Sequence, residues 1–365
     1  GSVLADKVTL DSRGILQVEG KPYFPVGMYT LQDKNGKNHD AILKEAREAG
    51  FNTTVFYAWT PETVMPLLDA AARQGIRAFV YPTIPFSVRT KELTDAEAIV
   101  DVKIRMNHPA LLGWYLVDEP EGIGKAKSNP VLDLNKLVKA TDPNHPTSLV
   151  IMHPDPAAGY FNCADIIWTD PYPIPKWSVN VVSHWVGDAV RIAGANKPVW
   201  AIPQAHDLNV WDTGKVIGEP RPTDAEERCM TYLALVHGAK GIIYWAHTAS
   251  RYYIRDYPEH WAYMKKLAGE LRDLSPVLLT ATLPAPAFEP ETATIDTMMK
   301  VQDGSIYVFA VNHEKTAQKV TFRLPKAAKP EVQVQFEKRS VPILNDTFTD
   351  DFAPLGVHVY KMPVK

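Results

Sequence analysis

Eight short apolar runs alternate with helix-patterned segments through the first three-quarters of this 365-residue chain. The runs are Phe24–Tyr29, Thr53–Tyr57, Ala78–Tyr81, Leu111–Val117, Ser148–Met152, Ile166–Thr169, Val199–Ile202 and Gly241–Trp245. Segments with helical spacing of apolar residues lie between many of them, namely Asp40–Ala49, Pro61–Gln74, Asp95–Asn107 and Ala225–His237. Eight strands with intervening helices predict an α/β fold, a (β/α)8 TIM barrel. A doubly wound open sheet is disfavoured, because no G-x-G-x-x-G turn follows the first run.

The pattern changes after Pro276. Five β-rich segments follow and are separated by turn residues: Thr292–Val301, Ser305–Asn312, Gln318–Leu324, Glu331–Glu337 and Val357–Met362. We therefore predict two domains, a barrel over residues 1–278 and a small antiparallel β-sandwich over residues 283–365. The segment Val8–Tyr23, with Gly20 at a turn, predicts a hairpin that caps the barrel floor.

The fourth run ends abruptly in two adjacent carboxylates, Asp118 and Glu119, which a proline follows. A buried parallel strand is apolar on both faces, so a charge marks the point where it leaves the sheet. In (β/α)8 barrels that point is the rim where catalytic side chains lie. Paired acids there indicate acid/base chemistry on a sugar or a similar polar substrate. The alternative is an exposed acidic loop after a core strand.

The other strand ends add aromatic and polar residues to the same rim. The candidate substrate-binding residues are Tyr29, Tyr57, Trp59, His153, Tyr172, His206, Trp245 and His247. Aromatic rings stack on the C–H faces of sugars, and polar groups orient the hydroxyls, so this set is typical of a carbohydrate site. Any one of these aromatics could instead be a packing residue, and each histidine a structural one. The histidines form no metal set, because no third ligand has matching placement.

The segment Met106–Pro120, which reads MNHPALLGWYLVDEP, resembles the strand-four signature of clan A glycoside hydrolases. In that clan the strand ends in Asn-Glu, and the Glu is the acid/base. The resemblance implies that Glu119 is the proton donor, that Asp118 contacts substrate, that Trp245 floors the sugar subsite and that Tyr172 contacts the nucleophile. The segments Gly20–Tyr29 and Phe352–Tyr360 resemble the start of such barrels and their C-terminal β-domains.

One position departs from this pattern. The clan places a nucleophilic Glu at the end of strand seven, where this chain has Gln204. An amide cannot be a carboxylate nucleophile. Four explanations remain: inversion, with Asp170, Asp207 or Asp118 activating a water; substrate assistance by a 2-acetamido group that Asp118 orients; an engineered Glu-to-Gln change; or a glycan-binding protein without catalysis. Inversion with Asp170 as base is favoured, because Asp170 lies at a strand end.

Composition excludes some partners. A formal net charge of -3 gives no reason to expect nucleic acid, and no apolar run approaches the roughly 20 residues that span a bilayer. Cys163 and Cys229 predict buried thiols rather than a disulfide. We expect a carbohydrate substrate, no cofactor, no metal and a secreted or periplasmic location. The sugar, its linkage, exo or endo action and the oligomeric state do not follow from the sequence.

Overall fold

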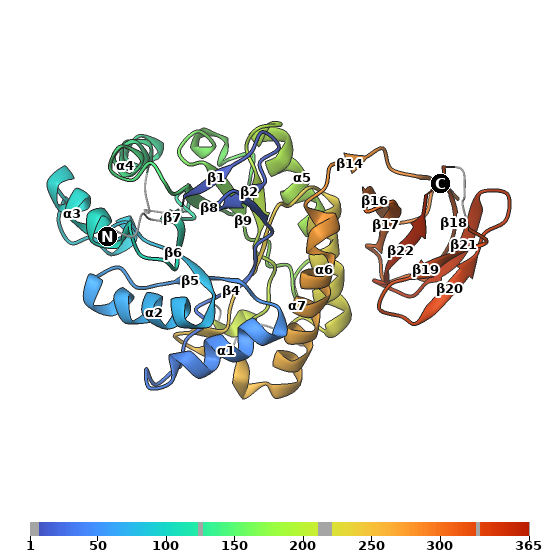
Figure 1. Ribbon diagram of the computed structural model, residues 1–365, viewed down its shortest axis with the longest axis horizontal. Helices are drawn as coiled ribbons and strands as arrows, with labels where there is room; N and C mark the ends of the chain where they lie inside the picture. The colour runs from blue at the N-terminus through green and yellow to red at the C-terminus, as the bar shows by residue number, and fades with distance from the viewer. Residues whose placement is uncertain (1–6, 123–126, 211–220, 326–328, 365) are drawn as a thin grey trace.

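The computed structural model of the protein describes residues 7–122, 127–210, 221–325 and 329–364. All eight apolar runs form strands of one closed parallel barrel, so the predicted fold class is confirmed. In barrel order these strands are β4 (Val26–Tyr29), β5 (Thr53–Phe56), β6 (Arg77–Val80), β7 (Leu111–Asp118), β8 (Thr147–Ile151), β9 (Ile166–Thr169), β10 (Val199–Ala201) and β11 (Ile242–Tyr244). Figure 1 shows the barrel on the left of the molecule.

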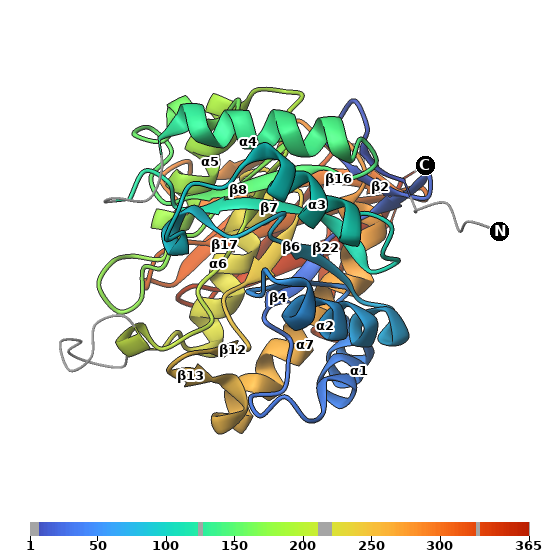
Figure 2. The same ribbon diagram turned by 90° about the vertical axis from the view of Figure 1, so that its left-hand side faces the viewer.

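Helices cover the outside of the barrel, as Figure 2 shows for α1 to α4. Their bounds are α1 (His39–Ala49), α2 (Pro61–Gln74), α3 (Asp95–Arg105), α4 (Ser128–Thr141), α5 (Val181–Ala193), α6 (Asp224–Val236) and α7 (Pro258–Leu278). Two of them begin with a capping box, in which the side chains of Thr94 and Glu97, or of Thr223 and Glu226, satisfy the free amides of the first turn. Short 3-10 turns are η1 (Phe86–Val88), η2 (Ala158–Tyr160), η3 (Leu208–Val210) and η4 (Ile254–Asp256).

Aromatic side chains fill the barrel interior. The rings of Trp168 and Trp200 stack with centroids 5.1 Å apart, and Phe79 meets both edge-on at 5.0 and 5.5 Å. Gly113 on β7 makes room for Phe79, because a Cβ there would lie 2.4 Å from the ring. The interior is therefore a packed core, and a ligand has space only at the ends of the strands.

The N-terminal segment closes the floor of the barrel. It forms a three-stranded sheet, β1 (Val8–Leu10), β2 (Leu16–Val18) and β3 (Lys21–Tyr23), where the sequence predicted a hairpin. The Val8 amide donates to the carbonyl of Asn144, and the Tyr23 hydroxyl to that of Asn52. Both acceptors precede barrel strands, so the sheet packs against the floor of the barrel. The opposite rim stays open.

Two antiparallel sheets follow the barrel and form the predicted β-sandwich. One has the order β14 (Thr282–Leu283), β16 (Ile295–Gln302), β17 (Ser305–Asn312), β22 (Val357–Pro363), β19 (Glu331–Val334) and β20 (Arg339–Pro342). The other has the order β15 (Ala287–Glu289), β18 (Gln318–Arg323) and β21 (Thr347–Phe352). Aromatic rings pack between them; those of Phe322 and Phe348, for example, are 5.1 Å apart. The exact domain limits, 1–278 and 283–365, stay a prediction.

Helices α6 and α7 lie between the barrel and the sandwich (Figure 1). Arg228 of α6 joins the two parts, because its guanidinium donates to the carbonyl of Val357 at 2.7 Å and pairs with Glu270 of α7 at 3.1 Å. Cys163 and Cys229 are buried free thiols, as predicted.

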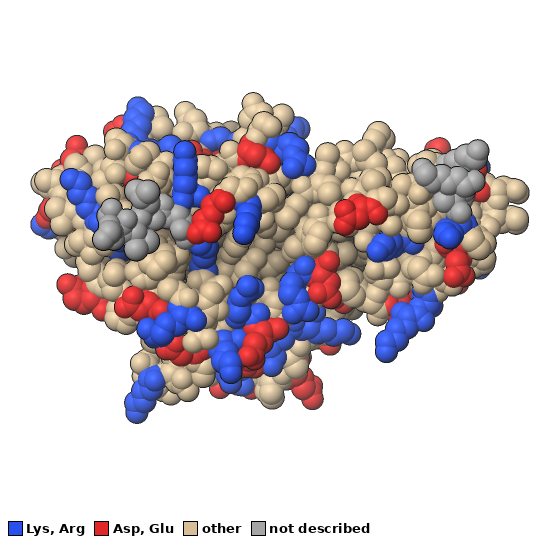
Figure 3. All heavy atoms as spheres, in the orientation of Figure 1, with Lys and Arg blue, Asp and Glu red and all other residues tan. Residues whose placement is uncertain are grey.

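Charge is spread evenly on the face shown in Figure 3, where basic and acidic side chains are interspersed. This distribution provides no single-sign patch on that face for a nucleic acid. Within the described ranges, none of the helices combines the length and the apolar character that a membrane crossing requires.

Candidate active site

A pocket of about 330 Å³ lies at the C-terminal ends of the barrel strands. Its lining residues follow or end six different strands: Tyr29, Tyr57, Asp118, Glu119, Met152, Asp170, Tyr172 and Trp245. All of them except Met152 are residues that the sequence singled out. They come together because the carboxyl ends of parallel strands in a closed barrel share one rim. Four of the eight lining residues are aromatic, and three are carboxyls.

Asp118 is held in place by a chain of tyrosines. The Tyr115 hydroxyl donates to Asp118 Oδ1 at 3.0 Å, and the hydroxyls of Tyr29 and Tyr115 are 3.0 Å apart. Because the Tyr115 hydroxyl donates its hydrogen bond to the carboxylate, its oxygen accepts a hydrogen bond from the Tyr29 hydroxyl. Burial, followed by the charge of Asp118, raises the pKa of both phenols well above the usual value. Both phenols therefore keep their protons at neutral pH, and their chain of hydrogen bonds fixes the carboxylate of Asp118.

Glu119 has an unusual backbone conformation. Its φ is +44°, in the left-handed region that non-glycine residues rarely adopt. The Glu119 amide donates to the carbonyl of Val150 at 2.9 Å, and its carbonyl accepts from Gly122 at 3.0 Å, so a tight turn begins here. In a regular strand neighbouring side chains point to opposite faces. Because the strand ends in this turn, both Asp118 and Glu119 line the pocket. Backbone strain of this kind is concentrated at functional sites.

Asp170, directly after β9, forms a hydrogen bond through its side chain with Glu119. The residue is only 5% exposed, and its Oδ1 has no hydrogen-bond partner. Burial is the main reason that the pKa of Asp170 is raised well above its usual value, and the charges of Glu119 and Asp118 add to the effect. A pKa raised in this way favours the protonated carboxyl, so Asp170 is the donor in its hydrogen bond with Glu119.

Glu121 is a fourth acid near Asp118, Glu119 and Asp170, and it was not among the residues predicted from the sequence. Its Oε1 accepts the backbone amides of Met152 and His153, which follow β8. Its Oε2 is buried without a hydrogen-bond partner, and burial raises the pKa of the carboxyl. Glu121 does not line the pocket; it fixes the end of β8 against the turn after Glu119. The only sequence signal was its position, two residues after Glu119.

Gln204 does not line the pocket either. Its side chain is fully buried, and its Oε1 accepts from the amide of Ile174 at 2.8 Å. Its Nε2 donates to the carbonyls of Ile174 at 2.9 Å and of His206 at 3.3 Å. This pairing with the loop after β9 needs a donor and an acceptor on one side chain. An amide supplies both, whereas a carboxylate supplies only acceptors. The local chemistry therefore fits a glutamine and not a displaced nucleophile.

The remaining predicted rim residues lie outside the pocket wall. His206 is buried edge-on against Tyr172 and Trp245, with ring centroids 4.6 Å from each, and burial lowers the pKa of His206 to about 3. His206 therefore backs the aromatic wall as a neutral ring. Trp59 is half-buried beside Tyr81.

The two other predicted histidines also lie away from the pocket. His153 is exposed and packs against Trp185. His247 is buried, its Nδ1 is 2.8 Å from the hydroxyl of Thr248, and burial lowers its pKa to about 3. In the part of the chain that the structure describes, no three His, Cys, Asp or Glu residues are placed to hold a metal ion.

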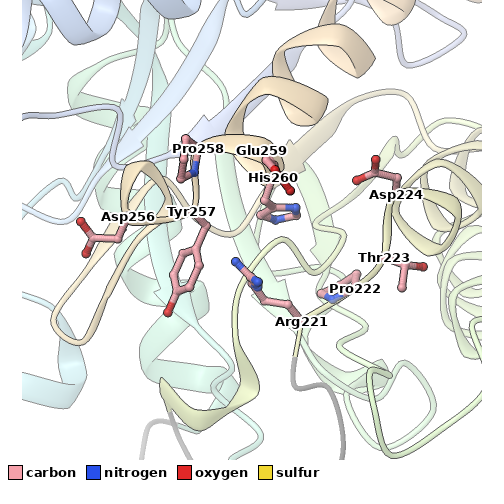
Figure 4. Close-up of a pocket in the computed structure, with 9 residues that line it drawn as sticks. All are labelled: Arg221, Pro222, Thr223, Asp224, Asp256, Tyr257, Pro258, Glu259 and His260. Atoms are coloured by element: carbon pink, nitrogen blue, oxygen red, sulfur yellow. The ribbon is translucent and has the colours of Figure 1, made fainter.

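A second pocket, of about 540 Å³, lies between the starts of α6 and α7 (Figure 4). Arg221 covers the ring of Tyr257 there at 3.8 Å, and the lining acids Asp224, Asp256 and Glu259 are exposed. Burial, opposed by Lys266 and aided by the charge of Glu259, raises the pKa of Asp224, but none of these acids is buried as Asp170 is. Although this pocket is larger, the reactive arrangement of contacting buried carboxyls belongs to the rim pocket.

Comparison with known proteins gives a likeness of fold only. No family model and no curated protein matches the sequence. A solved glycoside hydrolase structure superposes with a TM-score of 0.70 at 14% identity, covering 99% of this chain and 97% of that one. A family 5 glycoside hydrolase from Bacteroides vulgatus superposes with a TM-score of 0.67 at 15% identity, covering 98% of this chain and 94% of that one. A GH30 endoxylanase from Clostridium papyrosolvens superposes with a TM-score of 0.56 at 12% identity, covering 99% of this chain and 98% of that one.

Proposed function

We propose that this protein is a glycoside hydrolase in which Glu119 and Asp170 are the reacting carboxyls. The observation that carries the proposal is their side-chain hydrogen bond inside an aromatic pocket at the barrel rim. Hydrolysis of a glycosidic bond needs one acid to protonate the leaving oxygen and one carboxylate to act at the anomeric carbon. A pair with one shared proton supplies both. The fold shared with glycoside hydrolases supports this reading.

The roles follow from the position of the proton. The raised pKa of the buried Asp170 favours its protonated form, and Glu119 is the more exposed carboxyl of the two. When the proton crosses this hydrogen bond, Glu119 becomes the acid that protonates the leaving oxygen, and Asp170 becomes the carboxylate. Asp118, fixed by Tyr115, binds a sugar hydroxyl, and the rings of Tyr57 and Trp245 stack on the sugar.

The stereochemical outcome decides the role of Asp170. Inverting enzymes separate their carboxyls by roughly 6.5–9.5 Å to admit a water, and retaining enzymes by about 5–5.5 Å. Asp170 could act in either mechanism: it activates a water in the inverting mechanism that the sequence favoured, and it attacks the anomeric carbon directly in a retaining one. Proton NMR of the first-formed anomer distinguishes the two.

The proposal is tested with a panel of aryl glycosides and plant or algal oligosaccharides. We expect turnover by the wild-type chain and a loss of roughly 10²- to 10⁴-fold in kcat for Glu119→Gln. Asp207→Asn is the matched control, because Asp207 lies near the end of β10 but only caps a turn through Asn209. Saturable binding without turnover of any substrate would instead identify a glycan-binding protein, and an unimpaired Glu119→Gln variant would remove Glu119 from the mechanism.

A further inference from the structure

Trp177 is the largest exposed apolar side chain among the described residues, with 56% of its surface accessible. Single apolar residues on a surface are common and need no explanation. Trp177 differs from exposed chains such as Val100 because it lines a pocket of about 310 Å³. The barrel contributes Ile174, Trp177, Ser178 and Val179 to this pocket, and the sandwich contributes His313, Glu314, Lys315 and Leu355.

The barrel side of the pocket is rigid. Gln204 holds both backbone groups of Ile174, and the Trp177 amide donates to the carbonyl of Pro173 at 2.7 Å. Ile174 and Val179 are 5% and 2% exposed and anchor the loop on either side of the indole. The indole is therefore presented on a fixed loop, which lowers the entropic cost of binding a ligand.

The sandwich side is also fixed, and it supplies polar groups. The Leu355 amide donates to the carbonyl of Glu314 at 2.9 Å, and His313 pairs with Asp296 at 3.3 Å. Lys315 is 75% exposed and lies 3.4 Å from the carboxylate of Glu226. Ser178, Glu314 and Lys315 thus add a hydroxyl, a carboxylate and an ammonium group to the residues that line the pocket with Trp177.

We propose that this Trp177 pocket is a second carbohydrate-binding site, which holds a part of a glycan chain remote from the bond that is cleaved. The ring would stack on a sugar face while the polar groups bind its hydroxyls. The inference rests on the proposed function for its ligand class. It is supported by the chain path, because the loop between β9 and α5 carries Asp170 and Tyr172 at its start and Trp177 further on.

The test is affinity electrophoresis in gels that contain xylan, galactomannan, mixed-linkage β-glucan, laminarin or starch. All variants carry Glu119→Gln so that the polymers stay intact. We expect at least one polymer to retard the parent chain, Trp177→Ala to weaken that binding about tenfold, and Trp177→Phe to recover part of it. Leu344→Ala is the matched control, because Leu344 is a 73% exposed apolar side chain of the sandwich, between β20 and β21, and lines neither the Trp177 pocket nor the rim pocket. Thermal unfolding checks that each variant is folded.

Equal retardation of the parent and Trp177→Ala, or no retardation by any polymer, overturns the proposal. Turnover separates it from the proposed function. With Glu119 intact, Trp177→Ala should hydrolyse short aryl glycosides at the wild-type rate and show a raised KM only on the retarding polymer. If the wild-type chain cleaves no glycoside, the hydrolase proposal fails, while the electrophoresis still decides whether the Trp177 pocket binds sugar.

Discussion

Gln204→Glu is the perturbation that separates two readings of the seventh strand. If Gln204 occupies the place of a lost nucleophile, a glutamate there should create or raise activity. If Gln204 instead clamps the loop after β9, a glutamate should break the clamp. The structure supports the clamp, since the amide of Gln204 pairs with both backbone groups of Ile174 and donates to the carbonyl of His206.

The magnitude follows from those contacts. An ionised carboxylate in this fully buried position would face the carbonyls of Ile174 and His206, so the new acid must stay protonated. Holding it neutral at pH 7, against a reference pKa of about 4.3, costs roughly 3–4 kcal/mol. Its single proton can satisfy one of the two carbonyls, and the lost hydrogen bond adds about 1 kcal/mol. We expect Gln204→Glu to lower the free energy of unfolding by about 4–5 kcal/mol.

The assay is thermal and urea unfolding at several pH values. A loss of 4–5 kcal/mol lowers the unfolding midpoint by roughly 5–7 °C for a chain of 365 residues. The folded pKa of the new acid lies above the unfolded one, so the protonation cost is absent below about pH 4 and grows as pH rises, while the roughly 1 kcal/mol of the lost hydrogen bond remains at every pH. Gln333→Glu, at an exposed position of the sandwich, should change stability by less than about 0.5 kcal/mol. A Gln204→Glu variant as stable as the wild type, or more active, would refute the clamp.

Two further outcomes concern the core. Glu227 is fully buried without a hydrogen-bond partner, and burial raises its pKa well above 4.5, so the folded state binds its proton more tightly than the unfolded state. The stability advantage of Glu227→Gln over the wild type should therefore grow with pH above about 4.5, and an advantage independent of pH in urea unfolding would contradict this. Gly113→Ala should cost about 1–3 kcal/mol in the same assay because its Cβ would overlap the ring of Phe79, whereas the open site of Gly159 should tolerate alanine. Equal effects at the two glycines would contradict the packed interior.

The sequence predicted the barrel well because its strands are buried on both faces. Runs such as Leu111–Val117 contain no polar residue, so the limits of the strand are clear in the sequence. The helices between the strands carry capping residues such as Thr223, which mark where they begin. The short strands β20 and β21 were missed, because they carry alternating polar residues that resemble turns. The N-terminal segment was predicted as a hairpin but forms three strands. Each of these strands has only three residues, which is too short to show a clear periodicity in the sequence.

The pocket was predictable for residues at the very end of a strand. Tyr29, Asp118 and Trp245 line it because parallel strands bring their ends to one rim. The role of Gln204 was not predictable, because its partner Ile174 is 30 residues away in the chain. His206 lies two residues beyond Gln204, where the direction of a side chain depends on the loop. Tertiary packing buries it behind the wall instead of exposing it to substrate.

The most direct measurement is the kcat/KM of Asp170→Asn on the best aryl glycoside that the panel identifies. Asparagine keeps the shape of Asp170 but can neither share the proton of the pair nor become a carboxylate. We predict a loss of at least about 10²-fold without a loss of thermal stability, with Asp207→Asn as active as the wild type. An Asp170→Asn variant that retains the wild-type rate would contradict the assignment of Glu119 and Asp170 as the reacting pair.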